Sequence, residues 1–258
     1  MTVPVKSEPQ YVQVGASGLF VYRVGLGTMQ FGWSVDEAGS VKVLDAYAEA
    51  GGNFIDTADS RVPIEETLSA LTDLVRQGKV RYLGCSNYTA WRLVEALWAS
   101  DRRHLESFVS VQPEYNLLDP IRGLVEMELG LACRRYGIGM FPYSPLGGGL
   151  LTGKYRRDQA LPESVRAAEN AEQRFSDKNW QIIETLVEVA EANDHTPAQA
   201  AINWMLSKPW VTAPIIGANT SAQLTDVLNG LDKNLPDTAI AQLDDASEFS
   251  GWEPLGRR

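Results

Sequence analysis

Short apolar runs alternate with longer stretches of helical period along this chain, a pattern typical of a parallel α/β sheet. The apolar runs predict strands at residues 22–25, 53–56, 82–86, 107–112, 139–143 and 211–216. The amphipathic stretches predict helices at residues 40–50, 64–77, 91–99, 120–135, 177–192 and 197–206. The last helix has the clearest start, because Thr196 is followed by Pro197 and then by Gln199, as in a capping box. Gly78 and Gly137, each shortly before a predicted strand, fit helices that end in a left-handed residue.

This alternation predicts a parallel β/α fold derived from the TIM barrel, with six of the eight β/α units in an incomplete or smaller barrel. A full barrel typically takes about 250 residues, but part of this 258-residue chain lies outside the predicted units. We interpret residues 1–258 as a single domain, with an N-terminal extension at 1–20, a polar mobile loop at 156–176 and a tail at 251–258. The segment between residues 56 and 82 is long enough for a right-handed βαβ crossover.

Composition narrows the function classes. The net charge of −10 and the pI near 4.8 argue against nucleic acid or an anionic membrane as a partner. The two cysteines, Cys85 and Cys133, have no CxxC spacing, so we expect free thiols of a reducing cytoplasm and no metal site. No apolar run approaches membrane-spanning length. These features predict a soluble cytoplasmic protein.

The predicted strands all end in hydrogen-bonding residues, and the carboxyl ends of parallel strands meet at one rim. After the fifth strand, three consecutive glycines (147–149) are followed by Lys154, and after the sixth, residues 217–221 open a helix. Free backbone N–H groups, a helix N-terminus and a cation together suit a phosphate. Glycine also makes ordinary turns, and a lysine is often only a surface charge. Together, however, the two loops favour a phosphate-bearing ligand.

Several segments resemble the aldo-keto reductase family, in family order from about Val21 to Leu235. The matching motifs are Gly25-Leu-Gly-Thr-Met29, Asn53-Phe-Ile-Asp-Thr-Ala58, Val80-Arg-Tyr-Leu-Gly-Cys-Ser-Asn87, Val111-Gln112, Tyr143-Ser-Pro-Leu146 with Gly153-Lys154-Tyr155, and Ile215-Ile-Gly-Ala-Asn219. The resemblance implies an NADP(H)-dependent reduction of small aldehydes or ketones, with no Rossmann fingerprint.

The resemblance also implies roles for single residues. Asp56 would contact the nicotinamide ribose, Tyr143 would stack under the nicotinamide ring, and the carboxamide would be held by Ser86, Asn87 and Gln112. The pyrophosphate and the adenosine 2′-phosphate would be held by Ser144, Leu146, Lys154, Arg166, Gly217, Asn219 and Gln223. Thr28, Met29 and Gly148 complete the implied cofactor contacts.

The chain departs from the family at the catalytic set, which is Asp, Tyr, Lys and His. Asp56 matches the aspartate, but Arg61 stands where the tyrosine belongs, and the strands that carry the lysine and histidine are not found. We interpret this as an internal deletion between Ser60 and Val62 that removes about two β/α units. Tyr88 and Tyr115 follow predicted strands and are the remaining candidate acids, whereas His104 and His195 lie away from the rim.

Three interpretations stay open. The first is an NADP(H)-dependent carbonyl reductase. The second is a non-catalytic NADP(H)-binding protein, a role that potassium-channel β subunits of the same family make conceivable. The third is a deletion product without a function of its own. Removing two units leaves strand edges unpaired, so we also expect that the chain can self-associate through the exposed sheet edges.

Overall fold

The computed structural model describes residues 11–27, 35–50, 55–56, 64–76, 82–119, 121–157 and 175–248. Its strands are β1 (Tyr11–Gln13), β2 (Phe20–Tyr22), β3 (Gly25–Gly27), β4 (Ile55–Asp56), β5 (Leu83–Ser86), β6 (Phe108–Gln112), β7 (Gly139–Met140) and β8 (Ile215–Ile216). Its helices are α1 (Glu37–Glu49), α2 (Ile64–Arg76), α3 (Ala90–Arg103), α4 (Arg122–Leu124), α5 (Gly130–Tyr136), α8 (Asp177–Ala192), α9 (Pro197–Leu206), α10 (Ser221–Asn229) and α11 (Asp237–Ala246). A π-helical turn, η1 (Val125–Leu129), joins α4 to α5, and a 3₁₀ segment, η2 (Gly147–Thr152), follows β7.

Six parallel strands form two three-stranded sheets, in the orders β4-β3-β8 and β5-β6-β7. Backbone hydrogen bonds continue from one sheet to the other beside β7 and β8. Thr212 N donates to Met140 O at 2.8 Å, and Ile215 N donates to Pro142 O at 2.7 Å. The strands therefore run in the order β4-β3-β8-β7-β6-β5, and their carboxyl ends share one edge.

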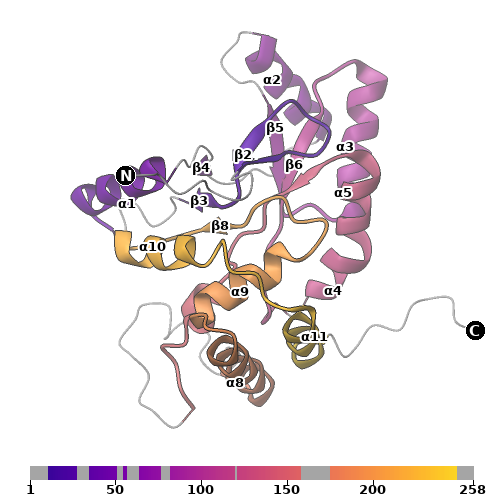
Figure 1. Ribbon diagram of the computed structural model, residues 1–258. Helices are drawn as coiled ribbons and strands as arrows, with labels where there is room; N and C mark the ends of the chain where they lie inside the picture. The colour runs from indigo at the N-terminus through magenta and orange to yellow at the C-terminus, as the bar shows by residue number, and fades with distance from the viewer. Residues whose placement is uncertain are drawn as a thin grey trace, which may run out of the picture.

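The outermost strands of this series, β4 and β5, are neighbours in sequence, with α2 between them (Figure 1). Among the described residues no ladder joins β4 to β5, so the described strands form an open series rather than a closed barrel. The predicted parallel α/β sheet is confirmed to this extent.

The predicted helices with strong local signals form where expected. α8 and α9 match their predicted bounds, and α2 differs from its prediction by one residue. At the start of α9, Gln199 N donates to Thr196 Oγ1 at 3.2 Å and Thr196 N donates to Gln199 Oε1 at 3.1 Å, so the capping box is confirmed. Gly137 ends α5 in the left-handed conformation, with φ 68°, also as predicted.

The prediction of one strand over residues 22–25 was wrong. Residues 11–22 form an antiparallel hairpin of β1 and β2, and the first parallel strand begins only at Gly25. The hairpin reaches the amino-terminal side of β7, where Ala16 N donates to Gly137 O at 2.7 Å. Val14 is fully buried there with Phe141, Ala213 and Ile215. The hairpin therefore covers the end of the sheet opposite the candidate site.

The continuous helix predicted at 120–135 is also wrong in part, because the π turn η1 interrupts it. Gly130 follows this turn and lies against the Trp210 ring, where a Cβ atom would come within 2.8 Å of Cγ.

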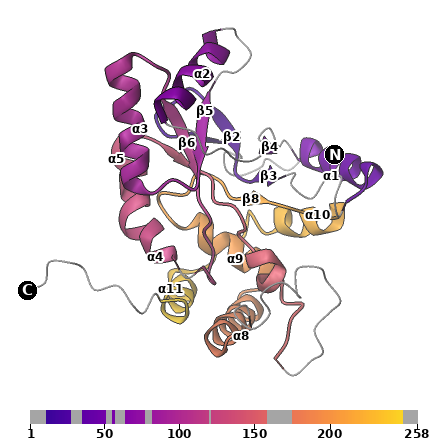
Figure 2. The same ribbon diagram turned by 180° about the vertical axis from the view of Figure 1, so that it is seen from behind.

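The helices form two groups around the sheet. In both views α3 and α5 lie together along one side of the sheet, while α8, α9 and α11 lie together below it (Figure 2).

Candidate cofactor site at the carboxyl ends of the strands

The ends of β5 and β6 are tied together at the rim. Ser86 Oγ donates to the carbonyl oxygen of Gln112 at 3.0 Å, and Asn87 N donates to the same oxygen at 2.9 Å. Asn87 adopts a left-handed conformation, with φ 56°, which turns the chain out of the strand. Three residues that the resemblance assigns to the nicotinamide carboxamide therefore lie in contact.

Tyr143 joins this group from the segment that follows β7. Its hydroxyl donates to Asn87 Oδ1 at 3.0 Å, and its backbone forms a parallel bridge with Glu114. Burial raises the pKa of the Tyr143 hydroxyl, and the negative charge of Glu114 raises it further. The side chain is thus a neutral phenol with a fixed ring. Asn87 is exposed at the rim.

The loop after β7 depends on glycine. Gly147, Gly148, Gly149 and Gly153 have φ angles of 55°, 65°, 98° and 77°, which residues with a Cβ atom rarely adopt. Lys154 is exposed and folds back over this turn, so that a Cβ atom on Gly149 would lie 3.3 Å from Nζ. The structure therefore brings the predicted cation to the predicted glycine turn.

The loop after β8 opens α10 with exposed residues. Gln223 N donates to Thr220 Oγ1 at 3.2 Å, and Asn219 N donates to Gln223 Oε1 at 2.9 Å. Gly217, Asn219 and Gln223 are all exposed. The Gln223 side chain closes the turn of its own loop, so two of the N–H groups that the sequence offers to an anion already have partners.

Several residues and segments named in the sequence predictions lie partly or wholly outside the described residues. The backbone of Asp56 pairs with Gly27 in β4, but its side chain is not among the described ones. Thr28, Met29, Arg61, Arg166, the turn at Gly78, residues 1–10 of the predicted extension, residues 158–174 of the predicted loop and the predicted tail also lie outside the described residues. The described part of the candidate site is thus the part that the resemblance assigns to the carboxamide and the phosphates.

The interpretation of Tyr115 as a candidate acid was wrong. Its side chain is fully buried and stacks on Trp204, with ring centroids 5.3 Å apart. Its hydroxyl donates to Glu126 Oε1 at 2.7 Å, and burial, followed by the Glu126 charge, raises its pKa. Tyr88 is half-buried, with the Arg92 guanidinium 4.4 Å from the centre of its ring.

The histidines have structural roles. His104 ends α3 in a left-handed conformation, with φ 53°. The ring nitrogens of His195 lie 2.6 Å from Asn193 O and 2.9 Å from Lys233 O. Both agree with the prediction that the histidines lie away from the rim.

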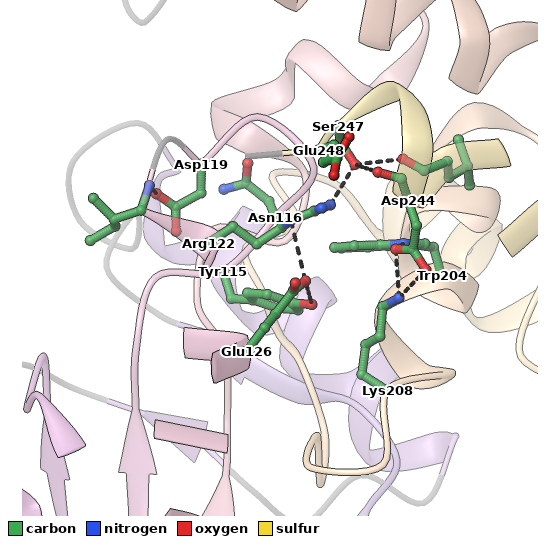
Figure 3. Close-up of polar contacts among 12 residues, drawn as sticks. Tyr115, Asn116, Asp119, Arg122, Glu126, Trp204, Lys208, Asp244, Ser247 and Glu248 are labelled. Carbon is green, nitrogen blue, oxygen red and sulfur yellow. Dashed lines mark hydrogen bonds and ion pairs between the residues drawn. The ribbon is translucent and has the colours of Figure 1, made fainter. Parts of the chain in front are cut away.

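Sequence reasoning missed a largely buried polar cluster behind the rim, shown in Figure 3. Its members are Tyr115, Arg122, Glu126, Trp204, Lys208, Asp244 and Ser247. Asp119 lies nearby, and burial raises its pKa to about 6. One sequence signal pointed to the cluster, namely Arg122 and Glu126 at helical spacing in a stretch otherwise rich in apolar residues.

The fold and the rim define an α/β protein with a candidate site for a phosphate-bearing ligand at the carboxyl ends of its strands. The chain belongs to the aldo/keto reductase family, whose sequence model matches residues 23–60 and 59–248. Members of this family generally use NAD(P)H and act on small carbonyl compounds. Among the described helices, none combines the length and the hydropathy of a membrane-spanning segment.

Three relatives illustrate the likeness. The chain is 26% identical over 326 residues to an uncharacterized oxidoreductase, YrpG, of Bacillus subtilis, and covers 98% of that protein with 95% of its own length. It is 34% identical over 178 residues to a probable voltage-gated potassium channel subunit beta of Arabidopsis thaliana, covering 54% of it with 67% of this chain. It is 29% identical over 235 residues to the versiconal hemiacetal acetate reductase of Aspergillus parasiticus, covering 65% of it with 88% of this chain. The chain thus spans less than two thirds of the last two relatives.

Proposed function

We propose that this chain binds NADP(H) at the rim described above and retains the cofactor half of an aldehyde and ketone reductase. The observation that carries the proposal is the contact of Asn87, Gln112 and Tyr143 at one rim, because these residues lie at or just beyond the ends of three different strands. The resemblance assigns all three to the nicotinamide, and the fold brings them together. The cofactor, when bound, supplies the hydride that reduces a carbonyl carbon.

The donor chemistry of the rim fits the phosphates of this cofactor. Lys154 supplies a cation beside the glycine turn at 147–149, and α10 directs its N-terminus to the same edge. Within the turn, Gly147 N and Gly149 N already donate to Ser144 O and Leu146 O, so the cation contributes more than these two amides do. Ser144 and Leu146 stand at the start of the turn. The neutral phenol of Tyr143, held by Asn87, offers a flat ring face for the nicotinamide.

We also propose that the fold contains six of the eight barrel units and that an internal deletion lies near residues 60–62. Two findings support this proposal. The family model matches in two segments that meet at residues 59 and 60. The alignment with YrpG extends over 326 residues, more than the 258 of this chain, so part of the relative has no counterpart.

A second candidate function is cofactor binding without efficient turnover. It is supported by Arg61, which stands where the family has its catalytic tyrosine, and by the absence from the sequence of the strands that carry the lysine and histidine. General acid catalysis raises the rate by about 10² to 10⁴-fold. Its loss would leave slow turnover, so the two candidate functions differ in the rate of turnover and share the binding of the cofactor.

Replacing Lys154 by methionine tests the phosphate end of the proposal. A charge-assisted hydrogen bond contributes about 1.5 to 3 kcal/mol, so we expect the NADPH dissociation constant to rise at least tenfold, measured by calorimetric titration. Lys178→Met is the matched control, because Lys178 donates to Glu248 O in another part of the fold. We expect this control to bind as the parent chain does. Unchanged NADPH affinity in Lys154→Met would contradict the assignment.

A further inference from the structure

The turn that follows Tyr143 starts from an unfavourable backbone conformation. Ser144 has a φ of 53°, although it is not glycine. Such a conformation is unfavourable for a residue with a Cβ atom and persists only where its surroundings impose it. Ser144 also precedes Pro145, whose ring restricts the preceding residue toward extended conformations. Something in the structure must hold this residue in place.

The holding contact comes from Asn116, in the loop after β6. Asn116 Nδ2 donates to Ser144 O at 3.0 Å, and Gly147 N donates to the same oxygen at 2.9 Å. The other end of the amide is also fixed, because Asn116 Oδ1 accepts from Leu118 N at 2.9 Å. The Asn116 side chain is 2% exposed, so water does not compete readily for these bonds.

The position of Asn116 is itself rigid. The preceding residue, Tyr115, is stacked on Trp204 and hydrogen-bonded to Glu126 (Figure 3). Its backbone nitrogen donates to Tyr143 O at 3.4 Å, directly before Ser144. The Asn116 amide is therefore fixed by the buried cluster on one side and reaches the rim loop on the other.

We propose that Asn116 is a positioning residue for the phosphate end of the cofactor. By holding the Ser144 carbonyl it keeps Ser144 left-handed, and this conformation sets the direction of the glycine turn and the place of Lys154. This inference rests on the proposed function, because it assumes that the turn receives a phosphate.

A double-mutant cycle with Ser144→Gly tests the proposal, because glycine adopts a φ near 53° without support. We expect Asn116→Ala to weaken NADPH binding about tenfold in the parent chain, which corresponds to about 1.4 kcal/mol. In the Ser144→Gly background we expect the same substitution to weaken binding less than about threefold, because glycine at position 144 keeps the left-handed conformation without the Asn116 contact. Equal losses in the two backgrounds, or no loss in the parent chain, would overturn the proposal.

Asn203→Ala is the matched control for general destabilisation. Asn203 is 6% exposed and its Nδ2 also donates to backbone carbonyls, those of Gln199 and Gly230, each at 3.0 Å. We expect this variant to lose stability and keep its NADPH affinity at a temperature where it is folded. A matching loss of affinity in the control would show that Asn116 acts through stability alone, against the proposal.

Amide hydrogen exchange without cofactor separates this inference from the proposed function. In Asn116→Ala we expect faster exchange at the Gly147 and Gly149 amides, which donate to Ser144 O and Leu146 O, but unchanged exchange in α9. If the parent chain fails to bind NADPH and the exchange changes as expected, the proposed function fails while the role of Asn116 in the turn stands. Unchanged exchange at these glycines would overturn that role.

Discussion

NADPH oxidation with a generic aldehyde is expected to run about 10² to 10⁴-fold more slowly with this chain than with a family member that carries the full catalytic set. The reason is the proposed loss of general acid catalysis, because the resemblance places Arg61 where the family has its tyrosine and matches no lysine that would lower the pKa of a substitute. Of the two tyrosines considered as substitutes, Tyr115 is fully buried and donates to Glu126.

Steady-state absorbance of NADPH, with purified chain of verified mass, measures this rate. The Lys154→Met variant shows how much of the residual rate depends on the proposed site. Turnover within about tenfold of the complete family member would contradict the account, because it would require an acid that this structure does not identify.

Replacing Arg122 by methionine is expected to lower the free energy of unfolding by about 3 kcal/mol. Arg122 is 5% exposed, and its Nε lies 3.2 Å from Glu126 Oε1 in an ion pair. Arg122 Nη1 donates to Ser247 Oγ, directly after α11. The guanidinium carbon lies 5.3 Å from the centre of the Trp204 ring. Methionine fills much of the volume of the arginine side chain, but it leaves the largely buried Glu126 without its cation.

Urea unfolding at neutral pH measures this loss, and Arg134→Met provides the matched control. Arg134 lies in α5, close to Arg122 in sequence, but it is exposed. Exposed charges contribute less than about 1 kcal/mol, so we expect a correspondingly small change. Equal losses in the two variants would show that the buried cluster does not anchor α11 to the π-helical turn.

The sequence predicted best the elements whose signals are local. The capping box at Thr196 and the apolar periodicity of the following residues lie within one helix, so α9 could be placed without knowledge of its neighbours. The same holds for α8 and for the glycine that ends α5. The loops that form the rim could also be predicted, because each follows a locally recognisable strand and parallel strands place their carboxyl ends together.

Features that depend on distant contacts could not be predicted. The β1–β2 hairpin is held against Gly137, more than a hundred residues along the chain, and its short strands resemble the extension that we expected there. Arg122 donates a hydrogen bond to Ser247, which lies 125 residues further along the chain. Asn116 looked like one polar residue among several after β6, and its role became visible only with the left-handed conformation of Ser144.

A thermal melt of the parent chain with and without saturating NADPH would show whether the cofactor half of the fold is intact. A ligand at 1,000 times its dissociation constant adds about 4 kcal/mol to the stability of the folded state, which corresponds to a rise in Tm of about 10 °C for a domain of this size. We expect a single cooperative transition that shifts to higher temperature with NADPH. A broad transition, or one that NADPH does not move, would contradict the claim that the cofactor half is intact.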